Sequence, residues 1–204
     1  MRPAPELGVL VRRLFEIGAI RFGEFTLKSG MRSPFYIDLR VVISFPDVLE
    51  RIGALMAAAV ARCGGDRVAG IPYAGLPLAV AASLAGRVPL IYPRREEKGH
   101  GIKRRVEGLF QPGERVVLID DIITDGGSKL EAIEPLEEAG LVVQDLVVLI
   151  DRQQGGPELL AARGYRLHAI LTISQCFDEG EAAGLAEARR IAEARAYLDT
   201  ARSA

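Results

Sequence analysis

Two adjacent carboxylates and a glycine-rich turn carry the strongest chemical signal in the sequence. Asp120 and Asp121 follow the apolar run 116–119, and the turn 124–128 (Thr-Asp-Gly-Gly-Ser) comes shortly after them. Glycines let backbone N–H groups approach an anion closely, and a helix N-terminus adds positive potential. The turn is therefore a candidate phosphate site, although a simple helix cap is the structural alternative. Since carboxylates repel phosphate, we expect the two acids to face sugar hydroxyls or Mg²⁺.

Two other phosphate motifs can be tested against the same sequence. A P-loop needs G-x-x-x-x-G-K-[ST], which the chain lacks, and Gly127-Ser128-Lys129 has the order reversed. The dinucleotide fingerprint also fails, because Gly99-His100-Gly101 is followed by no third glycine. A nucleotidase or a dehydrogenase is therefore disfavoured.

A basic segment at 92–107 is the second signal. It contains Gly99 and Gly101, which favour movement, and six cations: Arg94, Arg95, Lys98, Lys103, Arg104 and Arg105. A charge run is often only a solvated face. However, cations on a loop that closes over a substrate also stabilise a negatively charged leaving group.

A further segment suits a flat, anionic ring. Residues 25–36 predict a hairpin that carries Lys28 beside Phe35 and Tyr36. Aromatic rings contact the face of a planar ligand, and a positive charge attracts its carboxylate. A plain hairpin with core aromatics is the structural alternative. Asp151 and Arg152 follow the apolar run 146–150, where a plain surface ion pair is the structural interpretation.

The elements that must position these residues alternate along the chain. We expect strands at 68–71, 88–92, 116–119, 146–150 and 167–173, with helices at 6–17, 46–63, 76–84, 128–139 and 181–201. Ser44 and Asp47 predict an S-x-x-D start for the second of these helices. Apolar strands that alternate with helices predict an α/β fold with a parallel sheet covered on both faces. Ligands bind such sheets at the carboxyl ends of the strands.

Composition excludes several classes of protein. The 204 residues carry 26 Lys and Arg against 27 Asp and Glu, and this balance disfavours nucleic-acid binding through net charge. The two Cys and two His give no spacing typical of a zinc site, so we expect any metal to be a hard ion held by oxygens. No apolar run is long enough to cross a membrane, and few Cys fit a reducing compartment. We therefore expect a cytoplasmic chain of one domain, 1–204.

Residues 116–128 resemble the signature of type I phosphoribosyltransferases that binds 5-phosphoribosyl pyrophosphate (PRPP). Residues 25–36, 70–77, 94–101 and 151–156 resemble segments of the orotate enzymes in that family. The resemblance implies a parallel sheet flanked by helices, with a small hood from residues 1–42 and the C-terminal segment. It also implies PRPP contacts from Tyr73, Ala74, Arg94, Arg95, Lys98, His100, Asp120, Asp121, Ile122, Ile123, Thr124, Asp125, Gly126, Gly127 and Ser128. Many bacterial relatives carry Lys at position 74, and most carry a small residue at position 125.

The resemblance further implies the reaction and its partners. Orotate and PRPP would give orotidine 5′-monophosphate and pyrophosphate in pyrimidine biosynthesis, with Lys98, Arg95, His100, Asp120 and Asp121 in catalytic roles. Orotate would contact Lys28, Phe35, Tyr36, Thr124 and Arg152. Mg²⁺ would be held mainly by PRPP and water, with Asp120 or Asp121 as a further ligand, and the basic loop would cross to the neighbouring site of a homodimer. An adenine-specific transferase or a non-catalytic PRPP sensor are the alternatives.

Overall fold

A six-stranded sheet forms the centre of the molecule. The computed structural model describes residues 3–26, 32–94 and 105–202. The strand order is β5-β4-β3-β6-β7-β8, and neighbouring strands are parallel except for the antiparallel pair β4–β5. The strands are β3 (Arg67–Gly70), β4 (Leu90–Pro93), β5 (Val106–Glu107), β6 (Arg115–Ile123), β7 (Val142–Asp151) and β8 (Arg166–Thr172). The expected α/β fold with a mostly parallel sheet is confirmed.

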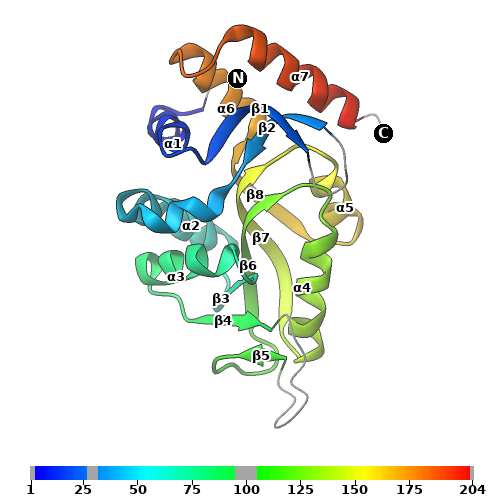
Figure 1. The fold of residues 1–204 in the computed structure, drawn as a ribbon. Helices are drawn as coiled ribbons and strands as arrows, with labels where there is room; N and C mark the ends of the chain where they lie inside the picture. The colour runs from blue at the N-terminus through cyan, green and yellow to red at the C-terminus, as the bar shows by residue number, and fades with distance from the viewer. Residues whose placement is uncertain (1–2, 27–31, 95–104, 203–204) are drawn as a thin grey trace.

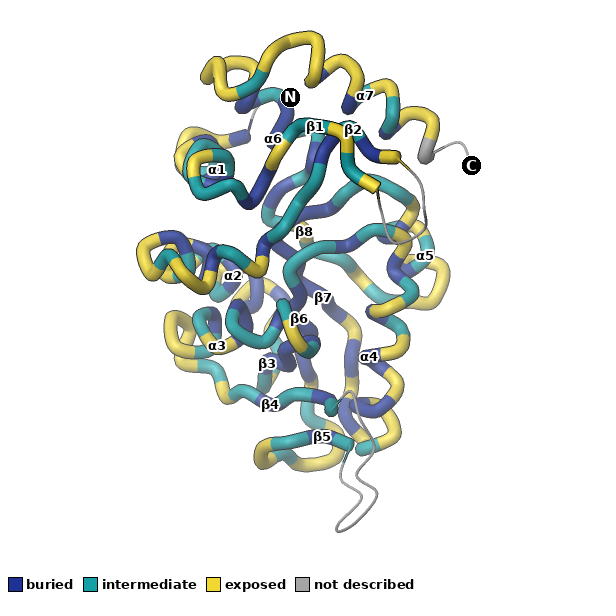
Figure 2. Tube along the Cα trace, viewed as in Figure 1, coloured by how far each residue is buried: buried dark blue, intermediate teal, exposed yellow. Residues whose placement is uncertain are grey.

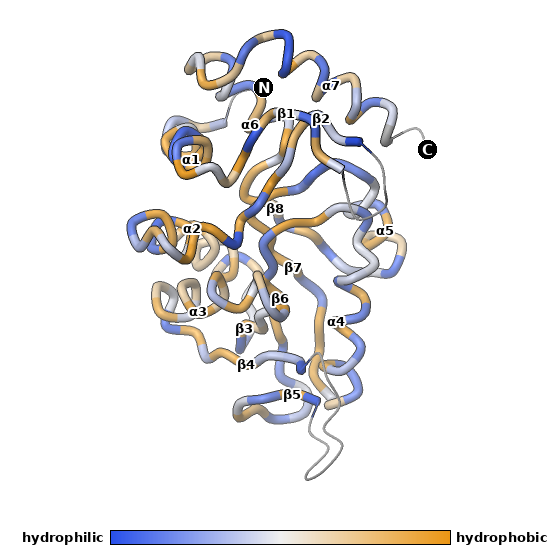
Figure 3. The backbone as a smooth tube through the Cα atoms, in the orientation of Figure 1, coloured by the Kyte–Doolittle hydropathy of each residue, from blue (hydrophilic) through white to orange (hydrophobic). Residues whose placement is uncertain are grey.

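Helices cover both faces of this sheet (Figure 1). On one face lie α2 (Pro46–Cys63) and α3 (Gly75–Gly86), and on the other lie α4 (Gly127–Glu138) and α5 (Gly156–Ala162). Strand β6 shows why helices must pack on both faces of the sheet, because its apolar side chains point to both sides. Its Val117 and Ile119 belong to one core cluster, whereas Val116 and Leu118 belong to the other. Figure 2 shows the buried central strands, and Figure 3 shows their apolar character, which α3 shares, whereas α4 and α7 carry more polar residues.

A smaller layered unit sits above the carboxyl end of the sheet (Figure 1). It contains the antiparallel pair β1 (Ile20–Thr26) and β2 (Arg32–Ile37), which leads through a 3₁₀ helix, η1 (Leu39–Ser44), into α2. Helices α1 (Pro5–Glu16), α6 (Ile173–Ala182) and α7 (Ala188–Arg202) pack around this pair. Phe177 of α6 joins the layers, because its ring lies 5.5 Å from Phe22 and 5.2 Å from Phe35 between ring centroids. We call this unit the hood.

Several predicted boundaries are wrong. Strand β6 continues to Ile123, so the two acids lie within the strand rather than after it. Helices α5 and α6 were not expected, although Thr172 and Gln175 form a capping box that starts α6. The single tail helix expected at 181–201 is instead α6 and α7, separated by a turn at Gly184, whose φ is +67°. The S-x-x-D start also fails, because Ser44 ends η1 and no side chain caps α2.

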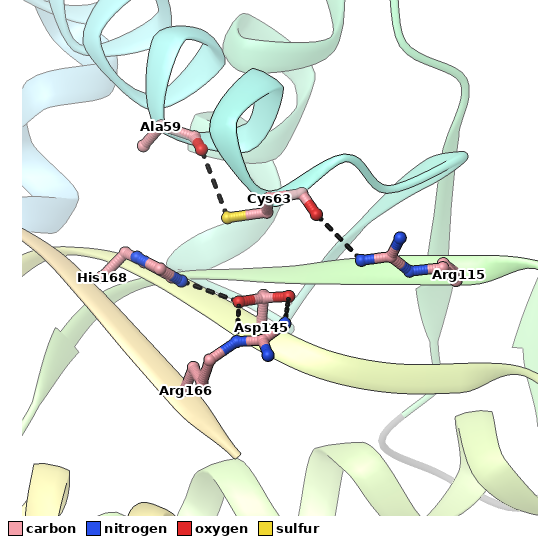
Figure 4. A network of polar contacts seen from close by, with 6 residues as sticks. All are labelled: Ala59, Cys63, Arg115, Asp145, Arg166 and His168. Atoms are coloured by element: carbon pink, nitrogen blue, oxygen red, sulfur yellow. Dashed lines mark hydrogen bonds and ion pairs between the residues drawn. The ribbon is translucent and has the colours of Figure 1, made fainter.

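An ion-pair network lies at the amino end of the sheet, away from the carboxyl ends of its strands. Asp145 of β7 accepts hydrogen bonds from Arg166 Nε and Nη2 at 2.9 and 2.7 Å, and its Oδ1 lies 2.8 Å from His168 Nε2 (Figure 4). Possible ligand atoms of Cys63, Asp145 and His168 lie within 4.8 Å of one another, a grouping that the sequence spacing did not indicate. Both oxygens of Asp145 are already paired, so we interpret the network as a structural tie between β7 and β8.

Candidate functional site

A cavity of about 630 Å³ opens at the carboxyl ends of the strands. Its walls come from the loop after β3, the end of β4, the last residues of β6 and the first turns of α4. The structure therefore brings together residues that lie up to 64 positions apart in the sequence, from Ile71 to Pro135. Nine of the residues expected to contact PRPP line it: Tyr73, Ala74, Arg94, Asp120, Asp121, Ile122, Thr124, Asp125 and Ser128.

The two acids of β6 occupy different environments. Asp120 is 7% exposed, and its Oδ2 accepts a hydrogen bond from Lys129 Nζ at 2.6 Å. Asp121 is less covered, and its Oδ1 accepts the backbone N–H of Ile122 at 2.8 Å. Burial, followed by the charge of the neighbouring Asp120, raises the pKa of Asp121 to about 7. One acid is thus held in an ion pair, while the other changes charge near neutral pH.

The glycine turn connects the end of β6 to the start of α4. Gly126 has φ +90° at the N-cap of α4, a backbone conformation that L side chains rarely adopt. Asp125 Oδ1 accepts the backbone N–H of Gly127 at 3.0 Å. The Asp125 carboxylate therefore accepts one of the N–H groups that an anion in this turn would use.

Close backbone packing fixes the turn against the loop that follows β7. Gly156 N donates to Thr124 O at 3.0 Å, and a Cβ at Gly156 would lie 2.5 Å from Ile123 Cγ1. Arg152 N also donates to Ile123 O at 3.0 Å, which continues the pairing of β6 with β7. Because only glycine fits at position 156, the phosphate turn and the Arg152 loop are held as one rigid group.

The loop 71–75 forms the wall opposite α4. Tyr73 is exposed, and Ala74 is the N-cap residue of α3. Gly75 approaches β6 so closely that a Cβ there would lie 2.7 Å from Asp120 Oδ1 and from Ile119 O. The backbone of α3 thus covers one oxygen of Asp120, and Lys129 binds the other.

Arg94 marks the start of the basic segment at the cavity. Its Nη1 lies 3.2 Å from Glu107 Oε1, and its backbone N donates to Arg105 O at 2.7 Å. Arg105 lines the same cavity and pairs with Glu138. Both ends of the basic segment therefore lie beside the acids. The predicted catalytic residues Arg95, Lys98 and His100 fall outside the described residues.

Arg152 lies where the hood meets the sheet. Its guanidinium carbon lies 5.1 Å from the centre of the Phe35 ring, and burial lowers the pKa of Arg152. Arg152 Nε is buried without a hydrogen-bond partner among the described residues. A buried donor with no acceptor is costly, so the geometry favours an anionic or carbonyl ligand at this position.

Phe35 does not fit the expected contact with orotate. It has 0% exposure, because the rings of Phe177 and Tyr197 pack against its edges and Arg152 covers it. Its role is to support Arg152. Tyr36 points its ring toward Arg21 and Phe25 and remains partly exposed, whereas Lys28 falls outside the described residues.

Lys129 and Tyr197 lie at the site but were not among the predicted site residues. Lys129 is 5% exposed and is bonded to Asp120, and Tyr197 reaches from α7 to the ring of Phe35 at 5.9 Å between centroids. Each had a local signal. Tyr197 shares a helical spacing with Ile191, Ala194 and Leu198, which are buried. Lys129 is a cation in the first turn of a helix, where it opposes the helix dipole.

Comparison with known proteins gives the family. No family model matches the chain. An orotate phosphoribosyltransferase of Archaeoglobus fulgidus is 41% identical over 74% of this chain and 85% of its own length. The chain belongs to the orotate phosphoribosyltransferase family. The crystal structure of the family member from Aeropyrum pernix has a TM-score of 0.75 and 36% identity, and the match covers 87% of this chain and 99% of that one.

A longer relative also matches within the family. Uridine 5′-monophosphate synthase of Bos taurus is 44% identical over 82% of this chain, but the match spans only 35% of the bovine protein. The chain therefore corresponds to about a third of that relative's length.

Within the described residues, no helix is long and apolar enough to span a bilayer.

Proposed function

We propose that this chain transfers the ribose 5-phosphate of PRPP to orotate, giving orotidine 5′-monophosphate and pyrophosphate in pyrimidine biosynthesis. Membership of the family supports the reaction class. The unpartnered Arg152 Nε is the single observation that carries the choice of base, because orotate supplies a carboxylate and carbonyl oxygens on one flat ring.

The chain's residues suit a displacement at the ribose. The bond between C1 and the pyrophosphate oxygen breaks as orotate nitrogen bonds to C1, so positive charge builds on the sugar and negative charge on the leaving group. Asp121, together with Asp120 as Lys129 holds it, accepts hydrogen bonds from ribose hydroxyls. The turn 124–128 holds the 5′-phosphate with backbone N–H groups. Arg94, Arg95, Lys98 and His100 of the basic segment bind pyrophosphate. The ring N–H of orotate loses its proton as this bond forms, and the departing pyrophosphate accepts it, so no strong protein base is needed.

Mg²⁺ fits the donors on the cavity wall. Asp120 and Asp121 supply hard oxygen ligands. Burial, followed by the charge of Asp120, raises the pKa of Asp121, and a bound cation would favour its charged form. Asp121 is the residue best placed to hold the ion, directly or through water. When bound, Mg²⁺ neutralises part of the pyrophosphate charge. We propose a Mg²⁺-dependent enzyme on these grounds.

We also propose a cytoplasmic homodimer whose basic loop reaches the neighbouring site. Val80 and Leu84 lie one turn apart on α3 and are both exposed, which supports an apolar contact with a second copy. Both cysteines are buried and free, which suits a reducing compartment. Sedimentation equilibrium would show a dimer, and a monomer at assay concentration contradicts this part of the proposal.

A substrate panel tests the function. The chain is incubated with PRPP and Mg²⁺ and with orotate, uracil or adenine, and pyrophosphate release is followed. Turnover with orotate alone is the expected result. Turnover with adenine but not orotate would make the chain an adenine-specific transferase, and PRPP binding without any turnover would make it a sensor.

A further inference from the structure

Lys129 is a buried cation at the edge of the site, where local structure disfavours one. It lies in the first turn of α4, which begins at Gly127, and the positive end of the helix dipole repels it. It is also 5% exposed, and lysine is rarely buried without a partner. A lysine that is both buried and placed at the positive end of a helix needs a specific anion nearby.

That anion is Asp120. Lys129 Nζ lies 2.6 Å from Asp120 Oδ2 and 3.3 Å from Ser128 Oγ. The two charged side chains are 6% and 10% exposed, so water screens their attraction weakly. The same contact links the end of β6 to the phosphate turn, since Ser128 belongs to that turn.

The ion pair changes the charge that the acids present to a ligand. Two bare carboxylates would oppose a substrate that carries a phosphate and a pyrophosphate. Lys129 balances one of the two charges from inside the protein. Gly75 lies against Oδ1 of Asp120 on the other side, so the carboxylate is held in one orientation.

We propose that Lys129 is a positioning residue that neutralises and orients Asp120, so that the acidic pair accepts the ribose of a polyanionic substrate with less help from a divalent cation. This inference rests on the proposed function, because it takes PRPP as the ligand. It makes Lys129 act through Asp120 and not through contact with the substrate.

A double-mutant cycle tests the inference without turnover. PRPP binding is measured by calorimetry for the wild type, Lys129→Met, Asp120→Asn and the double variant, each in EDTA and in excess Mg²⁺. Methionine keeps the length of the lysine side chain and removes its charge. Arg163→Met is the control, because Arg163 is an exposed cation in the β7–β8 connection and its loss changes net charge equally.

The inference predicts coupling and a metal effect. In EDTA, Lys129→Met should weaken PRPP binding by about 10-fold, a typical size for the coupling of two bonded charges. Excess Mg²⁺ should restore most of this loss, and in the Asp120→Asn background the lysine substitution should change little. Arg163→Met should bind PRPP as the wild type does.

Three outcomes overturn the inference. An equal loss in the Asp120→Asn background would place Lys129 directly on the substrate, and an equal loss with and without Mg²⁺ would make its role merely structural. Unchanged binding in Lys129→Met would remove any role. If Lys129→Met unfolds, the double variant must recover its melting temperature, since both buried charges are then gone. Failure of the proposed function looks different, because the wild type itself would then release no pyrophosphate with orotate.

Discussion

Arg152→Met gives the most direct test of how the site recognises the base. The Arg152 guanidinium lies 5.1 Å from the centre of the Phe35 ring, and methionine keeps the unbranched apolar stem of the side chain up to the position of Nε. The substitution therefore removes the guanidinium and little of the packing. Orotate should bind less well, while the fold should remain.

The structure sets the size of both effects. A hydrogen bond to a charged group contributes about 1.5–3 kcal/mol, so the KM for orotate should rise ~10- to ~150-fold. Stability changes less, because two contributions oppose each other. The loss of the cation–π contact costs about 0.5–2 kcal/mol, and removal of the unpartnered Nε donor regains about 1–3 kcal/mol. The melting temperature should therefore stay within a few degrees of the wild type.

The assay is orotate-dependent pyrophosphate release at saturating PRPP, together with a thermal melt. Arg163→Met is the matched control, since it removes an exposed arginine from the same β7–β8 connection. An unchanged KM for orotate would refute the reasoning. So would an equal rise in the KM for PRPP, because the defect would then not belong to the base.

Three further predictions follow from the structure. Gly75→Ala should lower the melting temperature and raise the KM for PRPP, because its Cβ would lie 2.7 Å from Asp120 Oδ1; wild-type values for both would contradict the close approach. Asp121 has a pKa raised to about 7, so the folded state binds more protons than the unfolded state between about pH 4 and 7. Stability should fall as pH rises through this window, and Asp121→Asn should flatten the fall in melts at pH 4–8; parallel curves would count against it. Asp145→Asn should lower the melting temperature by several degrees and leave both KM values unchanged, because Asp145 binds Arg166 and His168 away from the site; altered kinetics would show that the network reaches the cavity. The pKa of Asp145 is lowered to about 2, so its own contribution is present above about pH 4 and is lost as pH falls toward 2.

The sequence predicted what depends on local pattern. The apolar runs predicted the parallel strands. The two adjacent acids followed by a glycine-rich turn predicted the cavity residues Asp120, Asp121 and Thr124. It missed what depends on contacts between distant segments. Phe35 was expected at a ligand because aromatic residues near a cation suit one, but packing by Phe177 and Tyr197 buries it. The partner of Lys129 could not be predicted, because it lies nine residues away across the end of a strand.

The glycine contact between the phosphate turn and the Arg152 loop has a consequence for ligand size. Arg152 and Thr124 are held by adjacent strands, since Ile123 pairs with Asp151 and Gly156 N binds Thr124 O. The backbone separation between the anchor for the base and the anchor for the 5′-phosphate is therefore set by one interstrand spacing of about 4.8 Å. The Arg152 side chain adds its own reach, which its contact with the Phe35 ring restricts. Nucleotide analogues that lengthen the link between base and phosphate should be rejected even when each end alone is bound well. Analogues with a shortened link should be rejected equally. The backbone spacing of β6 and β7 thus selects the length of the link between base and phosphate.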